Sequence, residues 1–191
     1  QSAGALQCLL NLLQQDPSIA LEPEKITSIH ITAYEPAFGI IGDPAKRDPK
    51  TRQSADHSMV YIVSAMLKKA QDVAKEEGAA FFNQSNDEIW KRLMLTPYDF
   101  DMDAVFHPTA RAIMETVSFE HGGAQYDEKY PDGIPTSMKI TLSDGTVLDS
   151  GFIMYPTGHA RNTTANLGDI LVTKFKMLGD IAMDDPSEVI K

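Results

Sequence analysis

A cluster of cations directly before a histidine is the first place in this sequence where chemistry can be expected. The loop over residues 46–52 runs into Asp56-His57-Ser58. Its cations are Lys46, Arg47, Lys50 and Arg52. Ser54 fits the N-cap of a helix beginning here, and a helix N-terminus offers unpaired N–H groups and a partial positive charge. This combination favours an anionic ligand, either a carboxylate or a phosphate.

His57 could supply acid/base chemistry at this junction. In a helix that starts at Ser54 it would lie about three residues in, where the helix dipole disfavours the imidazolium and keeps a neutral ring available. A neutral imidazole is what a general base requires. A purely structural alternative stays open: Asp56 would then interact only with its own helix N-terminus, and Arg52 would form a solvated ion pair with it.

A second polar group stands at the exit of a predicted strand. The run Tyr155-Pro156-Thr157-Gly158-His159-Ala160-Arg161-Asn162 leaves that strand abruptly. His159 has a cation close to it in the sequence, which makes it and Arg161 candidates for substrate contacts. The alternative is that His159, coming after a glycine, only supports a turn.

Hydrophobic periodicity predicts the elements that would position both groups. The predicted helices cover 2–14, 54–69, 87–95, 108–116 and 167–178. The predicted strands cover 26–34 and 117–119, together with two arms of a hairpin, 138–143 and 146–154. Asp144-Gly145 between these arms is typical of a two-residue turn of type I′.

Individual side chains follow from the same patterns. Cys8 is expected in the core of the first helix, and His30 on the less apolar face of the first strand, in a surface or sheet-packing role. In the last helix, the residues expected to face inward are Ile170, Leu171, Phe175 and Leu178. The tail beyond this helix, up to Lys191, is polar and is expected to be peripheral.

The composition excludes several classes of protein. Because 17 basic residues stand against 27 acidic ones, for a net charge of −10, a nucleic-acid partner is not expected. No stretch approaches the roughly 20 apolar residues of a membrane span, so no membrane partner is expected either. The single cysteine excludes an internal disulfide and any cysteine-only metal site within this chain, and the five scattered histidines form no metal pair. We therefore expect no metal.

Three runs of residues resemble one known family. These are RQSADHSMVYIVSAML from residue 52, YPDGIPTSMKITLSDGTVLDSGFIMYPTGHARN from residue 130, and KFKML from residue 174. Together they resemble the C-terminal region of the MmgE/PrpD family. The combination of Asp-His-Ser at a helix start with Tyr-Pro-x-Gly-His-x-Arg-Asn after an Asp-Gly hairpin is the specific part of the resemblance, which covers most of the chain.

The resemblance implies a fold and a reaction. The fold is α+β (mixed α/β), a small antiparallel-type sheet with packed helices, forming the lid of a two-domain enzyme. The reaction is the dehydration of a tricarboxylate, 2-methylcitrate to 2-methyl-cis-aconitate, without an iron–sulfur cluster or other cofactor. Related members decarboxylate cis-aconitate. A third alternative, from a different class, is a non-catalytic α+β module that captures an acidic ligand at residues 46–58.

The resemblance also implies roles for individual residues. By motif, His57 matches the catalytic histidine of the lid. Substrate contacts are expected from Lys50, Arg52, Ser58, His159 and Arg161. Members of the family vary in length and charge just before Asp-His-Ser. The roles of Lys50 and Arg52 are therefore inferred from their position near His57, and the role of His57 from the motif itself.

The same resemblance predicts how the chain is organised. Residues 1–162 are expected to form the lid domain, and residues 163–191 a C-terminal helix and tail leading back toward a helical domain of the same protein. Because the chain opens with Gln1, we expect a fragment that is inactive alone, and a processed mature protein is the alternative. A homodimer of the full-length enzyme is compatible with this picture. We expect a soluble intracellular protein, placed in the cytoplasm of a bacterium or in the mitochondrial matrix of a eukaryote.

Overall fold

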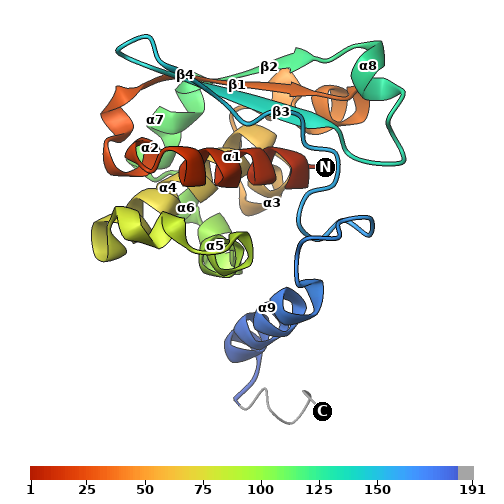
Figure 1. Ribbon diagram of the computed structural model, residues 1–191. Helices are drawn as coiled ribbons and strands as arrows, with labels where there is room; N and C mark the ends of the chain where they lie inside the picture. The colour runs from red at the N-terminus through yellow and green to blue at the C-terminus, as the bar shows by residue number, and fades with distance from the viewer. Residues whose placement is uncertain (185–191) are drawn as a thin grey trace.

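The computed structural model describes residues 1–184 as a small twisted sheet with its main helices gathered against one face (Figure 1). The predicted α+β fold is confirmed. The helices are α1 (Ala3–Gln15), α2 (Ser18–Leu21), α3 (Arg52–Asp56), α4 (Met59–Glu77), α5 (Asn86–Leu93), α6 (Met102–Val105), α7 (Pro108–Thr116), α8 (Ala124–Asp127) and α9 (Leu167–Ala182). The strands are β1 (Ile26–Ala33), β2 (Val117–His121), β3 (Thr136–Leu142) and β4 (Val147–Asp149). Short helical turns connect several of these elements, among them η5 (Pro97–Phe100).

The sheet has the strand order β2-β1-β3-β4. Strands β1, β3 and β4 pair antiparallel, as a hairpin-containing sheet should. Strand β2 instead pairs parallel to β1, with Ile29 opposite Val117. A parallel neighbour requires a long crossover connection. Here the helices α3 to α7 supply it, because they lie between β1 and β2 in the chain.

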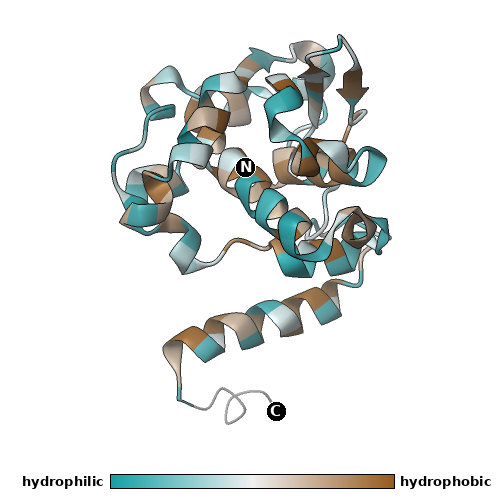
Figure 2. Ribbon diagram, turned by 90° about the vertical axis from the view of Figure 1, so that its left-hand side faces the viewer, coloured by the Kyte–Doolittle hydropathy of each residue, from teal (hydrophilic) through white to brown (hydrophobic). Residues whose placement is uncertain are grey.

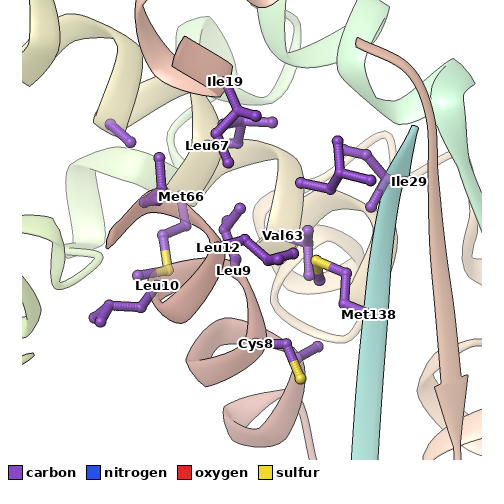
Figure 3. Packing of buried hydrophobic residues seen from close by; sticks show 14 of the residues in the cluster. Cys8, Leu9, Leu10, Leu12, Ile19, Ile29, Val63, Met66, Leu67 and Met138 are labelled. Carbon is purple, nitrogen blue, oxygen red and sulfur yellow. The ribbon is translucent and has the colours of Figure 1, made fainter. Parts of the chain in front are cut away.

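The core lies between the sheet and the helices packed against one of its faces, chiefly α1 and α4. Strand β1 turns Ile29 and Ile31 inward while His30 faces out, where its ring nitrogens lie 3.0 Å from Ser118 Oγ and 3.1 Å from Glu120 Oε2. Figure 3 shows the inner side chains meeting those of α1 and α4. The labelled members are Cys8, Leu9, Leu10, Leu12, Ile19, Ile29, Val63, Met66, Leu67 and Met138. The core position predicted for Cys8 is confirmed, and burial raises the pKa of its thiol to about 12.

The predicted hairpin forms, but its turn differs from the expected one. Leu142 accepts a hydrogen bond from Gly145 N–H at 3.0 Å and donates its own N–H to Thr146 O at 2.8 Å. Within the turn, at residues 143–145, Gly145 is the one residue with a positive φ, 88°, whereas a type I′ turn needs two such residues. The loop is therefore a three-residue turn with glycine in the left-handed position. The second arm is also shorter than predicted, since β4 ends at Asp149.

The last helix, α9, forms where a helix was predicted, yet its apolar side chains do not face inward. Leu171 is 53% exposed and Phe175 is 44% exposed, and Leu178 is exposed as well. Of the four residues expected inside, Ile170 alone is buried. Figure 1 shows α9 as an arm set apart from the sheet, and Figure 2 shows hydrophobic segments along it. Periodicity identifies an apolar stripe on a helix but does not say what covers it.

The described part of the chain ends at residue 184, within the predicted tail. The polar tail was predicted to reach Lys191, and its last residues, 185–191, lie outside the described part of the chain. In residues 1–184, no helix combines the length and the apolar character that crossing a membrane requires.

Candidate functional site

The junction around His57 is a break between two helices, and not the single helix predicted from Ser54. Thr51 caps α3: its Oγ1 accepts the N–H of Ser54 at 3.1 Å, while Ser54 Oγ accepts the N–H of Thr51 at 2.9 Å. Helix α3 then ends at Asp56. Ser58 starts α4 by accepting the N–H of Tyr61 at 3.3 Å. The prediction was wrong because each of these helices has its own capping residue, and Ser54 closes a capping box instead of acting as the cap.

His57 therefore lies between the two helices, where its ring is anchored by one nitrogen. The side chain is 62% exposed, and Nδ1 lies 2.9 Å from the backbone carbonyl of Gln53. A carbonyl can only accept, so Nδ1 carries the hydrogen and Nε2 is the free nitrogen. His57 does not lie within the first turn of a helix, as was predicted. It lies between the C-terminal end of α3 and the N-terminal end of α4, whose dipoles act on an imidazolium in opposite senses. What the structure offers instead is an oriented ring with Nε2 directed away from its anchor.

Lys50 and Arg52, the two cations predicted to contact the substrate beside this histidine, differ in whether they form an ion pair. Lys50 is paired with Asp48 at 2.7 Å. Arg52 forms no ion pair with any residue of the described part of the chain, and its side chain is exposed. Arg52 and His57 stand at the two ends of α3, about 7.5 Å apart along the helix axis. Arg52 is thus available to bind an anionic ligand, whereas Lys50 is already paired.

Two further members of the predicted group, Arg47 and Ser58, have structural partners. Arg47 turns toward the sheet, where its guanidinium lies 5.3 Å from the centre of the Phe119 ring and its Nε donates to the carbonyl of Gly42 at 3.2 Å. Ser58 is fully buried, and its hydroxyl serves as the cap of α4. Its substrate contact stays a prediction, and the observed hydrogen bond accounts for the serine without a ligand.

The loop before α3 is fastened to the fold by Arg111 of α7. Its guanidinium donates to Asp48 Oδ1 at 2.6 Å, to the carbonyl of Pro49 at 2.5 Å and to the carbonyl of Val105 at 2.9 Å. Lys50 and Arg111 together hold the pKa of the Asp48 carboxyl below its usual range. Nothing in the sequence patterns indicated Arg111, because it lies outside the basic loop and about 60 residues further along the chain.

The second predicted group forms a turn whose polar groups contact one another. His159 Nδ1 accepts the N–H of Arg161 at 3.1 Å, and its ring lies 5.1 Å from that of Tyr155. Arg161 donates to Asp132 at 2.9 Å, and this hydrogen bond raises the pKa of its guanidinium further. Gly158 has a φ of 92°. These contacts are those of the structural alternative, in which His159 supports the turn.

Arg161 also lines a polar groove of about 410 Å³. The other polar residues around this groove include Gln7, Asn11, Asn86, Thr157, Asn162, Thr163 and Thr164. Neither His57 nor Arg52 lines it. Among the described residues, no hydrogen bond or ion pair links this turn to the His57 junction, so the two predicted groups are not brought together by contacts within this chain.

A buried amide that the sequence patterns missed holds the second group in place. Gln7 Oε1 accepts both the indole N–H of Trp90 at 3.0 Å and the N–H of Thr157 at 2.9 Å. Gln7 Nε2 donates to Asn11 Oδ1 at 2.9 Å. The signal was a glutamine within the apolar run of the first helix, where a buried polar group must find partners.

Comparison with known families identifies the first half of the chain. Residues 1–94 match the family model of the MmgE/PrpD C-terminal domain. This part of the chain belongs to the MmgE/PrpD family. The match includes Arg52, His57 and Ser58, whereas His159 and Arg161 lie beyond it. No curated protein matches the chain. The MmgE/PrpD family includes dehydratases and other lyases.

Proposed function

We propose that this MmgE/PrpD chain is the lid of a hydro-lyase that converts 2-methylcitrate to 2-methyl-cis-aconitate in the methylcitrate cycle of propionate catabolism. One observation carries the proposal. Within the residues that match the family, His57 is anchored through Nδ1 and leaves Nε2 free, one short helix away from the free cation Arg52. An oriented imidazole and an unpaired guanidinium at the two ends of one short helix suit a substrate that carries several carboxylates.

The elimination divides into two proton transfers. A base takes the carbon-bound proton, the electrons of that C–H bond form the C=C bond, and an acid protonates the hydroxyl, which leaves as water. If His57 is the base, its neutral Nε2 accepts the carbon-bound proton. If His57 is the acid, its protonated Nε2 gives a proton to the leaving hydroxyl. Arg52 binds one carboxylate in either case. The complementary acid or base belongs, in this proposal, to the helical domain of the longer protein.

The reaction itself is tested on the full-length enzyme and on this 191-residue chain. We expect the full-length enzyme to form 2-methyl-cis-aconitate from 2-methylcitrate, measured by chromatography of the product. The isolated chain should show no turnover, because it supplies only part of the acid/base pair. Measurable dehydration by the purified chain would contradict the lid proposal.

Two controls separate the alternatives. Supplying cis-aconitate and finding itaconate would point to the decarboxylase of the same family. Titrating citrate into the isolated chain addresses the non-catalytic module. Tight binding by this chain alone, lost in Arg52→Ala, together with an inactive full-length protein, would support the module and refute the dehydratase.

The two cations of the loop should differ in their contribution to substrate binding. In the full-length enzyme, Arg52→Ala should raise KM for 2-methylcitrate by on the order of 10-fold or more, because a hydrogen bond to a charged group contributes about 1.5–3 kcal/mol. Lys50→Ala is the matched control, and it should change KM less, since Lys50 is already paired with Asp48. Steady-state kinetics measures both, and equal effects would show that the pairing does not keep Lys50 from the substrate.

A further inference from the structure

The guanidinium of Arg111 is placed to organise the His57 junction from outside it. Two of its donations join α7 to Asp48 and Pro49, which stand three and two residues before Thr51, the N-cap of α3. The third, to Val105, ties the same group to the end of α6. The guanidinium also lies 4.8 Å from the centre of the Phe106 ring. Arg111 itself is largely covered, whereas its partner Asp48 is exposed.

We propose that Arg111 is a positioning residue for the candidate active site, acting through the loop at 48–49 to set the start of α3 and, with it, the direction of Arg52 and the anchoring of His57. This inference rests on the proposed function. Arg111 is not expected to touch the substrate, because all three of its donor nitrogens are engaged by the protein.

Helix α3 needs such external support. It has only five residues, and a helix this short is not stable on its own. Ala55 is its one buried residue. The capping box of Thr51 and Ser54 satisfies the first N–H groups but does not fix the helix to the rest of the fold. The two contacts of Arg111 at residues 48–49 supply that attachment, with Lys50 alone between them and the cap.

The choice of arginine matters at this position. A guanidinium is planar and presents its donors in a fixed fork, so that one side chain can hold a carboxylate and two carbonyls at once. A lysine has a single nitrogen and cannot span the same three acceptors in that geometry. We therefore expect Arg111→Lys to retain the charge but to lose the positioning.

Asp48 links Arg111 to the cations of the loop. It accepts from Arg111 at 2.6 Å and from Lys50 at 2.7 Å. Arg111 thus fixes the carboxylate that holds Lys50, while Arg52 forms no ion pair with any described residue. Asp48→Asn weakens the clamp from its exposed side and gives a variant with little risk to the fold.

The test uses the ring of His57 as a reporter in the 191-residue chain. With ¹⁵N-labelled histidine, NMR should show the Nδ1–H tautomer that the 2.9 Å contact with Gln53 requires. In Arg111→Met and Arg111→Lys, this tautomer should give way to a mixture like that of free histidine. In the full-length enzyme, the same variants should raise KM for 2-methylcitrate by on the order of 10-fold, with a smaller change for Asp48→Asn.

The matched control is Arg92→Met, which removes an arginine whose hydrogen bonds go to Glu76 and Glu77 on a different helix end. It should leave the His57 spectrum unchanged. An unchanged tautomer and KM in folded Arg111→Met overturns the proposal. If Arg111→Met does not fold, Asp48→Asn takes its place as the test. An unshifted His57 spectrum and an unchanged KM in Asp48→Asn would also overturn the positioning role of Arg111. The spectrum needs no catalysis, so loss of the tautomer in a protein without dehydratase activity would refute the proposed reaction while leaving the positioning role intact.

Discussion

Replacing His57 with alanine in the full-length enzyme should lower kcat/KM for 2-methylcitrate, the proposed substrate, by about 10²- to 10⁴-fold, the range for loss of a positioned acid or base. The side chain is 62% exposed and its one hydrogen bond is to its own helix, so the substitution should leave the fold intact. Steady-state kinetics together with thermal unfolding of the variant measures both effects.

The control for this substitution is another histidine without a predicted chemical role. His30 lies on the outer face of the sheet, where it contacts Ser118 and Glu120. His30→Ala should retain kcat/KM close to that of the parent enzyme. A near-normal kcat/KM in His57→Ala would remove the central claim of the proposed mechanism.

The pH profile of the same pair of enzymes assigns the proton transfer. If Nε2 acts as the base, kcat/KM of the parent falls as acid protonates it, and the variant lacks this acidic limb. If Nε2 acts as the acid, activity falls on the alkaline side, where the proton has been lost, and the variant lacks that limb instead. A parent and variant with the same profile would leave His57 with neither role.

Apolar periodicity predicted much of the fold because burial follows it directly. Helix α4 keeps Met59, Val63 and Met66 in the core, as the spacing required, and β1 alternates as expected. The hairpin was recognisable because its Asp-Gly pair lies between two such patterns. Long-range pairings leave no comparable local signal. The parallel pairing of β2 with β1 depends on where an 83-residue crossover ends, between Ala33 and Val117.

The candidate site was harder to predict because it is made of polar residues that periodicity does not describe. Residues 52–57 carry no apolar stripe, so the break between α3 and α4 had to be read from caps. Thr51 and Ser58 each suit an N-cap, and choosing Ser54 instead merged two helices into one. The motif singled out His57, but neither its anchor at Gln53 nor the contacts of Arg111 with the preceding loop could be predicted from sequence patterns.

A large loss of stability from adding a single methyl group is expected at Gly4. There the backbone of α1 passes so close to β3 that a Cβ would lie 2.8 Å from Thr136 Cβ and 3.0 Å from the carbonyl of Ile134. Thr136 is buried and donates its hydroxyl to that same carbonyl at 3.0 Å, so it has no free space to move into. Overpacking of this kind costs about 1–3 kcal/mol. Gly4→Ala should therefore lower the urea midpoint of unfolding, with an unchanged m-value.

Gly168 provides the matched control, because it is also a glycine in the first turns of a helix. A Cβ there would meet only Asn166 Oδ1, at 3.6 Å, which is an ordinary contact. Alanine is favoured over glycine within helices by up to about 1 kcal/mol, so Gly168→Ala should leave stability unchanged or raise it. Opposite signs for the two substitutions would show that the close approach of α1 to β3 sets the cost. A stable Gly4→Ala protein would contradict the packing of α1 on the sheet, and with it the scaffold from which α4 and the His57 junction are held.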